Sequence, residues 1–196
     1  SNNLADRVLR GVGWSREKVQ KTMNRSREPV NFRINDQILN ANVDLELVTT
    51  RCANVIGEIK SGNRKYRSEY VVLGAHFDHV GEGGVGSGSR SPDRLQVHPG
   101  ADDNASGASG LLEIAQKLAA NKSRLKRSIL LIGFDAEEKG LLGSKYFMNN
   151  PTVDPNKIIT MINMDMIGRM KDSSVTVGGV GTSPLFKPLM DSLGTD

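Results

Sequence analysis

The chain has 196 residues, of which 37% are hydrophobic and 24% are charged, so it is long enough for one globular domain with a buried core. Its 26 basic and 22 acidic residues are largely interspersed and leave a net charge of +4, and no RNP motif or Cys/His finger is present, which argues against nucleic-acid binding. The single cysteine excludes an intramolecular disulfide, and the longest apolar run, residues 128–134, is far shorter than the roughly 20 residues of a membrane-spanning helix.

The amino-terminal part of the chain has weak structural signals. Two short helices are predicted, over residues 5–11 and, behind a serine that can cap its first turn, over residues 15–23. Strands are predicted over residues 32–35 and 41–59. In the early part of the second, residues 41–48, apolar and polar side chains alternate, which is the pattern of a half-buried strand.

The middle of the chain predicts a layered α/β fold. Residues 70–75, 128–134 and 158–164 are continuous apolar runs, which are typical of strands covered on both faces in a mainly parallel sheet. An apolar stripe at helical spacing follows the first run, over residues 108–119, and a second helix is predicted over residues 140–148. This alternation predicts a mixed, mainly parallel central sheet with helices on both faces.

The remaining segments extend this pattern. One more strand and helix are predicted, over residues 175–178 and 183–193. Residues 81–100 form a long loop in which 11 of 20 positions are Gly, Ser or Pro, and a loop of this length is usually functional or mobile. The loop begins with a G-x-G-x-x-G pattern, but no helix follows it, so a dinucleotide site is disfavoured.

Histidine and acidic residues follow each apolar run directly, and two aspartates precede the predicted helix. In a parallel sheet the carboxyl ends of the strands meet at one edge, so we expect these side chains to lie close together. Carboxylates about 4 Å apart repel by several kcal/mol at an effective dielectric constant near 20, and divalent cations compensate that repulsion. The set of nitrogen and oxygen donors suits zinc or a similar ion. The candidates are His76, Asp78, Asp102, Asp103, Glu137, Glu138 and Asp165.

Each candidate also has a simpler interpretation. Because Phe77 turns to the opposite face, Asp78 is placed to accept a hydrogen bond from the ring of His76, an arrangement that is usual for metal-bound histidines. Two adjacent glutamates after a buried strand can be divided between a ligand and a general base, whereas one of the two aspartates is a natural helix cap. We expect His79 and His98, on the loop flanks, to be surface or supporting groups rather than ligands.

Four motifs carry a family resemblance: GAHFDHVG, PGADDNASG, FDAEEKGLLGS and INMDMIG, which together span about residues 70–170. At these motifs the chain resembles the dizinc exopeptidases, the family of bacterial leucyl aminopeptidases, aminopeptidase Y and glutamate carboxypeptidase II. The resemblance implies two zinc ions and a general base that moves a proton from water to the leaving amine. By this resemblance His76 and Asp165 bind one ion, Glu138 binds the other, Asp103 binds both, Glu137 is the base and Asp78 orients His76.

The resemblance also implies an organisation for the chain. Residues 1–30 are expected to form a helical lead-in, similar to the end of an inserted protease-associated domain, and residues 31–196 a partial catalytic domain. The family has a further histidine ligand downstream of the INMDMIG motif, and this sequence has no histidine after His98. We therefore expect a catalytic domain that is truncated on its carboxyl-terminal side.

The function expected from the resemblance is hydrolysis of peptide bonds, with the amino-terminal residue of a peptide or protein as the group removed. Two alternatives remain open: a catalytically inactive relative that serves as a binding or receptor-like module, and a single-zinc acyl transferase similar to glutaminyl cyclase. Many relatives are exported, which favours an extracellular or periplasmic location.

Overall fold

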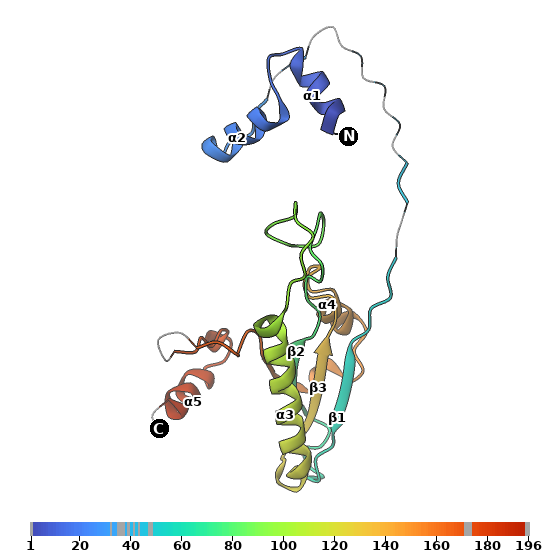
Figure 1. The fold of residues 1–196 in the computed structure, drawn as a ribbon. Helices are drawn as coiled ribbons and strands as arrows, with labels where there is room; N and C mark the ends of the chain where they lie inside the picture. The colour runs from blue at the N-terminus through green and yellow to red at the C-terminus, as the bar shows by residue number, and fades with distance from the viewer. Residues whose placement is uncertain are drawn as a thin grey trace. The chain divides into compact units, whose positions relative to one another are not determined.

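The computed structural model describes residues 2–31, 33–34, 38, 40, 42, 44–46, 49–170 and 174–194. The chain divides into two compact units, Ser1–Thr49 and Thr50–Asp196 (Figure 1). The predicted division into a lead-in over residues 1–30 and a catalytic domain from residue 31 stays a prediction.

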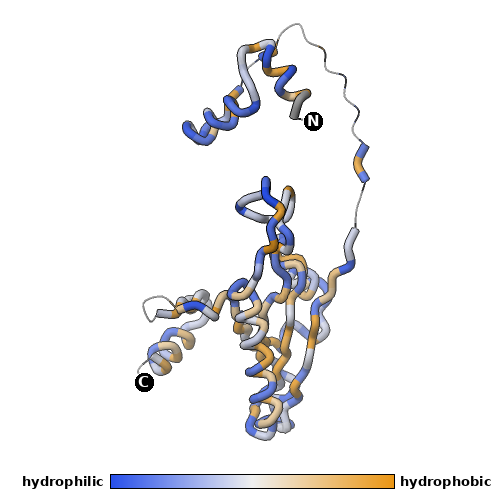
Figure 2. The backbone as a smooth tube through the Cα atoms, viewed as in Figure 1, coloured by the Kyte–Doolittle hydropathy of each residue, from blue (hydrophilic) through white to orange (hydrophobic). Residues whose placement is uncertain are grey.

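The first unit contains two helices, α1 (Asn2–Arg10) and α2 (Arg16–Ser26). Ser15 caps α2 as predicted, because its side chain accepts a hydrogen bond from the backbone N–H of Lys18 at 3.2 Å. Arg27 caps the carboxyl end of the helix: it adopts the left-handed conformation and donates its N–H to the carbonyl of Met23. None of the α2 side chains is buried, and its residues are mostly hydrophilic (Figure 2).

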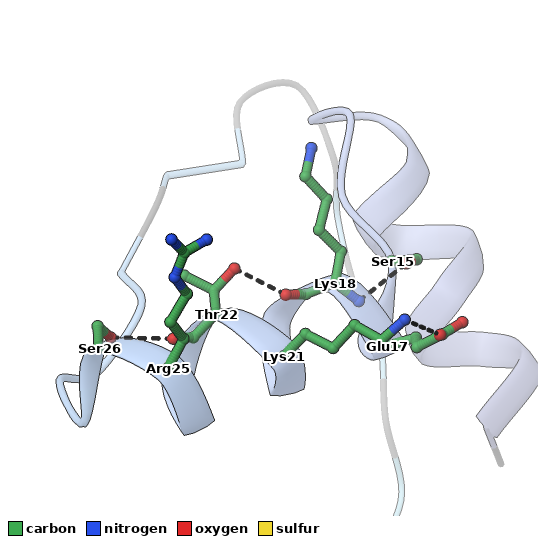
Figure 3. A pocket seen from close by; sticks show the side chains of 7 residues that line it. All are labelled: Ser15, Glu17, Lys18, Lys21, Thr22, Arg25 and Ser26. Carbon is green, nitrogen blue, oxygen red and sulfur yellow. Dashed lines mark hydrogen bonds and ion pairs between the residues drawn. The ribbon is translucent and has the colours of Figure 1, made fainter.

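A hollow of about 740 Å³ runs along α2 (Figure 3). Its one carboxylate, that of Glu17, pairs with Lys21 at 2.7 Å, and its lining includes no histidine or cysteine. It therefore offers no group of metal ligands. The lining residues are Ser15, Glu17, Lys18, Lys21, Thr22, Arg25 and Ser26.

The strands predicted upstream of residue 55 are not found in the described residues. Of the prediction over residues 32–35, only Arg33 and Ile34 are described, and neither lies in a strand. Of the prediction over residues 41–59, the described residues form one strand, β1 (Val55–Ile59). Leu45 is 90% exposed, so the alternating pattern does not mark a half-buried strand there, and part of it lies outside the described residues.

The second unit is built on a four-stranded sheet in the order β1-β3-β2-β4. The apolar runs form β2 (Tyr70–His76), β3 (Ser128–Phe134) and β4 (Ile158–Asn163), as predicted. Strand β2 pairs in parallel with both β3 and β4, whereas β1 is antiparallel to β3. The sheet is therefore mixed and mainly parallel, which confirms the predicted fold class.

The register brings the carboxyl ends of the three parallel strands to one level. His76 pairs with Phe134, and Gly74 pairs with Asn163. The antiparallel strand β1 starts at the same edge, with Val55 opposite Gly133. The residues that follow β2, β3 and β4 therefore emerge at one edge of the sheet.

Helices cover both faces of the sheet, as predicted. On one face, α3 (Gly107–Ala120) packs Leu111 against Leu73 and Ala75. On the other face, α4 (Leu142–Asn149) packs Phe147 against the strand core. Because successive side chains of a strand point to opposite faces, both faces of β2 and β3 need apolar residues, which explains their continuous apolar runs (Figure 2).

Two parts of the second unit differ from the prediction. Strand β4 is an edge strand among the described residues, and Ile159 and Ile162 are about half exposed rather than covered on both faces. The strand predicted over residues 175–178 is absent, with Val175 and Val177 exposed, and the final helix is shorter than predicted, at α5 (Phe186–Leu193). Short helical turns occupy Lys122–Arg124, Pro155–Lys157 and Val180–Thr182. Residues Ala101–Ser106 form a further short segment that the non-helical backbone of Asp103 and Asn104 interrupts. None of the helices in the described part of the chain has the length and apolarity needed to cross a bilayer.

Replacing Ile132 by alanine is expected to lower the free energy of unfolding by about 3–4 kcal/mol, because its side chain is 0% exposed and its removal leaves a cavity against Leu130, Phe134 and Phe147. Ile159→Ala, on the half-exposed edge strand, is the matched control and should cost less than about 1.5 kcal/mol. Urea denaturation of both variants measures the difference. Equal destabilisation would contradict this description of the core.

Candidate metal centre

His76 is the last residue of β2 and only 3% exposed. Its Nδ1 atom lies 3.1 Å from the backbone carbonyl oxygen of Asp78. A neutral imidazole carries a proton on one nitrogen and a lone pair on the other, so a proton on Nδ1 that is donated to this carbonyl leaves the lone pair on Nε2. The local backbone therefore sets the direction in which His76 offers a ligand atom.

The Nε2 atom of His76 faces two carboxylates. It lies 3.3 Å from Oδ1 of Asp103 and 3.5 Å from Oδ1 of Asp165, and it is a buried atom without a hydrogen-bond partner. Three electron-rich atoms thus converge on one point, an arrangement that a proton or a cation stabilises. Burial lowers the pKa of His76, but the carbonyl of Asp78 and the nearby carboxylates outweigh it and raise the pKa above its usual value.

The carboxylate of Asp78 connects His76 to the loop after β3. It accepts hydrogen bonds from the backbone N–H groups of Glu137 at 2.9 Å and of Glu138 at 3.2 Å. Oδ1 of this carboxylate lies 3.7 Å from Nδ1 of His76, whereas the backbone carbonyl oxygen of Asp78 lies 3.1 Å from it. The ring of His76 therefore contacts the Asp78 carbonyl rather than the carboxylate. Asp78 therefore holds the two glutamates beside His76.

Asn104 joins three segments of the site. Its amide nitrogen donates to the carbonyls of Met164 at 3.0 Å and His76 at 3.3 Å, and its oxygen accepts from the N–H groups of Gly107 at 3.0 Å and Met166 at 3.1 Å. Its side chain is fully buried, so these four hydrogen bonds satisfy all its polar capacity. Asn104 therefore links the ends of β2 and β4 to the start of α3.

A second group of possible ligands lies next to the first. Nδ1 of His79 is 2.7 Å from Oε1 of Glu138 and 3.9 Å from Oδ2 of Asp103. One oxygen of Asp103 therefore faces the group with His76 and Asp165, and the other faces the group with His79 and Glu138. Asp103 belongs to both groups.

Glu137 lies at the same edge and belongs to neither group. It lines a hollow of about 330 Å³ together with His76 and Asp165. Burial is the main cause that raises the pKa of the Glu137 carboxyl; His76 opposes the shift, and the carboxylates of Glu138, Asp165 and Asp78 add to it. A carboxyl group with a raised pKa is suited to accept and return a proton near neutral pH.

Two sharp turns bring the acidic residues to the edge. Ala136, between β3 and Glu137, has φ 55°, and Met166, directly after Asp165, has φ 52°. Left-handed backbone costs a non-glycine residue about 1–2 kcal/mol, and such residues are concentrated at functional sites. Asp102 supports the second turn by accepting a hydrogen bond from the N–H of Gly168 at 2.9 Å.

Both groups consist of donor types that zinc accepts, and the first group also has the spacing of zinc ligands. Two ligand atoms of a tetrahedral zinc ion lie about 3.3 Å apart, given bond lengths of about 2.0–2.1 Å. The distances from His76 Nε2 to its two carboxylate oxygens, 3.3 and 3.5 Å, match this spacing. Imidazole and carboxylate are also ligands that zinc accepts, and three atoms among the groups, His76 Nε2, His79 Nδ1 and Glu138 Oε1, are buried without a hydrogen-bond partner.

The structure thus brings all the predicted site residues to one edge of the sheet. It also brings in two residues that the sequence reasoning did not assign. His79, predicted to be a surface or supporting group on a loop flank, contacts Glu138, and Asn104, to which the sequence analysis gave no role, links three segments of the site. The position of His79 inside the GAHFDHVG motif was the one signal for it, whereas no sequence signal indicated the four hydrogen bonds of Asn104.

Comparison with known proteins finds curated relatives that are named aminopeptidases and a solved structure that is named a glutaminyl cyclase. A probable lipoprotein aminopeptidase of Mycobacterium tuberculosis, LpqL, is 27% identical over 188 residues, which are 94% of this chain and 34% of that protein. An aminopeptidase of Pseudomonas aeruginosa is 32% identical over 141 residues, covering 71% of this chain and 23% of that protein. The crystal structure of a Porphyromonas gingivalis glutaminyl cyclase covers 59% of this chain and 40% of that chain, with 31% identity and a TM-score of 0.46.

The chain spans about a third or less of the length of these curated relatives. The model of peptidase family M28 matches residues 54–195, which include every residue of both groups of possible ligands. Because this match covers well over half of the sequence, the chain belongs to peptidase family M28.

Proposed function

We propose that this chain carries the catalytic centre of a zinc-dependent aminopeptidase that binds two zinc ions and uses Glu137 as its general base. The observation that carries the proposal is the pair of ligand groups that share Asp103 at the carboxyl edge of the sheet. Family membership and the named aminopeptidases among the relatives support it.

His76, Asp103 and Asp165 would hold one ion, and Asp103 and Glu138 would bind the other. Zinc supplies Lewis acidity at such a centre: it polarises the scissile carbonyl and makes water more acidic. The chain's own residues prepare the centre, because Asp78 holds the loop with both glutamates through two backbone hydrogen bonds. Asn104 fixes the strand ends that carry His76 and Asp165.

Glu137 would take a proton from water and return it to the leaving amine. Its carboxyl lines the hollow beside His76 and Asp165, and its raised pKa brings proton uptake and release closer to the working pH. The same hollow is lined by the apolar side chains of Phe134 and Met161. We therefore expect the centre to accept an apolar residue at the substrate amino terminus.

Zinc-loaded protein is expected to hydrolyse leucine p-nitroanilide and to lose this activity in a chelator, with recovery when zinc is added. N-acetyl-leucine p-nitroanilide is the matched control, because it keeps the scissile bond and the side chain but blocks the free amine. Absorbance of released nitroaniline measures both reactions.

Each alternative has its own outcome in this assay. Equal hydrolysis of the blocked substrate would contradict an aminopeptidase. Cyclisation of an amino-terminal glutamine without anilide hydrolysis would support an acyl transferase, and zinc binding without any turnover would support a binding module.

We further propose that the protein acts outside the cytoplasm, since one relative is named a lipoprotein aminopeptidase. Cell fractionation followed by immunodetection tests this proposal. A purely cytoplasmic signal would contradict it.

A further inference from the structure

The two ends of the loop that carries both glutamates, residues 136–142, are held together by three residues. Asp135 precedes the loop and Gly143 follows it, and the N–H of Gly143 donates to the carbonyl of Asp135 at 3.0 Å. Asn54, directly before β1, binds both of them. Its Oδ1 accepts from the N–H of Asp135 at 3.1 Å, and its Nδ2 donates to the carbonyl of Gly143 at 2.8 Å.

The carboxylate of Asp135 adds two hydrogen bonds to this arrangement. Its Oδ2 accepts from the N–H of Ala53 at 3.0 Å, and its Oδ1 accepts from the N–H of Ala136 at 2.8 Å. Ala53 and Asn54 thus exchange hydrogen bonds with Asp135 just beyond the last residue pair between β1 and β3. Side chains therefore continue the connection between these two strands where the backbone pairing ends.

All four backbone N–H groups of residues 135–138 donate to side chains. The first two donate to Asn54 and to Asp135 itself, and the last two donate to Asp78. None of these four acceptors is a backbone carbonyl, so three side chains set the path of the backbone here. Asp78 holds the half that carries the glutamates, and Asn54 and Asp135 hold the half that leads into it.

The backbone at Ala136 needs such support. Its φ of 55° is left-handed, a conformation that alanine adopts only when its surroundings impose it. The N–H of Ala136 donates to Asp135, and its carbonyl accepts from the N–H of Leu142 at 3.1 Å. Glu137 is the next residue, so a rotation of the backbone at Ala136 would turn its carboxyl away from the hollow that it lines.

The contact between these segments is close. A Cβ atom at Gly143 would collide with the carbonyl oxygen of Asp135 and with Oδ1 of Asn54, so glycine is required there. Asp135 lines the same hollow as Glu137, but each of its carboxylate oxygens already accepts a backbone hydrogen bond, and it belongs to neither ligand group. Asp135 is therefore suited to hold Glu137 rather than to bind an ion.

We propose that Asp135 and Asn54 are positioning residues for the general base. Together they hold the left-handed turn at Ala136, so that the carboxyl of Glu137 stays in the hollow beside the zinc ligands. The inference rests on the proposed function, in which Glu137 takes and returns the proton. Neither Asp135 nor Asn54 contacts zinc or substrate in this proposal, and both act through Glu137.

A double-mutant cycle with leucine p-nitroanilide tests the inference. Asp135→Ala should lower kcat by about 10- to 100-fold, with KM little changed and both zinc ions bound, because a shift of about 1 Å in a catalytic group is enough for such a loss. In a Glu137→Gln background the same substitution should lower kcat by less than about 3-fold, because no base remains to be positioned. Zinc content is measured by mass spectrometry on each sample.

Asp154→Ala is the matched control. The carboxylate of Asp154 also accepts a backbone hydrogen bond, from Asn156 at 2.9 Å, but it precedes the amino-terminal end of β4 and belongs to neither ligand group. Its kcat should equal that of the parent in both backgrounds. If Asp135→Ala does not fold, Asn54→Ala and the more conservative Asp135→Asn replace it in the same cycle, and each should show the same dependence on Glu137.

The outcomes separate this inference from the proposed function. Loss of kcat by the same factor in both backgrounds is the result of a merely structural role, and it would overturn the inference alone. An unchanged kcat in Asp135→Ala would do the same. A wild-type protein that binds zinc but does not hydrolyse the anilide would overturn the proposed function and the inference with it.

Discussion

Replacing Glu137 by glutamine is expected to lower turnover by about 10²- to 10⁴-fold while both zinc ions stay bound. The glutamine side chain has nearly the same shape, and the backbone N–H of residue 137 still donates to Asp78, so the loop should keep its position. A carboxamide cannot take a proton from water, however, which removes the step proposed for Glu137. Turnover of leucine p-nitroanilide and zinc content by mass spectrometry are measured on the same sample.

Glu113→Gln is the matched control, because Glu113 is an exposed glutamate on α3 and belongs to neither ligand group. Its turnover should equal that of the wild type. Near-full activity in Glu137→Gln would exclude Glu137 as the base. Loss of zinc from that variant would instead identify Glu137 as a ligand.

Replacing Asp103 by alanine is expected to remove both zinc ions and all measurable turnover. One of its oxygens lies 3.3 Å from His76 Nε2 and the other lies 3.9 Å from His79 Nδ1, so a single substitution takes one donor from each group. Loss of one donor from a three-donor group should lower the affinity for each zinc ion by at least about 100-fold. Isothermal titration with zinc measures both affinities.

Asp102→Asn is the control for this prediction. The neighbouring Asp102 accepts a hydrogen bond from Gly168 and belongs to neither group, and asparagine keeps an oxygen for that bond. This variant should bind two ions. If Asp103→Ala still binds one ion as tightly as the wild type, Asp103 does not bind both ions, and the proposed assignment of ligands to the two ions is wrong.

The sequence predicted the strands of the second unit well because burial leaves a clear pattern there. Residues of β2 and β3 are covered on both faces by α3 and α4, so nearly every position had to be apolar. The polar residues that end these runs, such as His76 and Glu137, therefore stood out. Their grouping followed from one topological rule, that parallel strands present their carboxyl ends at one edge.

In segments that helices do not cover on both faces, the pattern of apolar residues predicted burial less well. The alternation in residues 41–48 predicted a half-buried strand, yet the described residues 44–46 form no strand and Leu45 is exposed; the other apolar positions of the pattern lie outside the described residues. Strand β4 has the composition of a buried strand but lies at an edge among the described residues, and its isoleucines are half exposed. The composition of a strand indicates which of its side chains are apolar enough to be buried, but not which other elements pack against them.

His79 and Asn104 show the limit at the level of single residues. Both lie inside motifs that the sequence singled out, yet their contacts depend on where distant segments arrive: Glu138 for His79, and Met164 for Asn104. The direction of an imidazole or amide side chain is set by packing and hydrogen bonds that spacing alone does not contain.

By itself, the sequence determined the alternation of strands and helices, the chemical types of the donors and the edge at which they gather. These properties follow from side-chain polarity and from the periodicity of regular structure, which are local. The family resemblance had already implied that Asp103 serves both ions, with His76 and Asp165 on one side and Glu138 on the other. Only the tertiary structure showed that the two oxygens of Asp103 face these two sides and that His79 lies beside Glu138. That division depends on distances of a few ångströms between atoms of four separate segments, and such distances exist only once the sheet has brought the segments together.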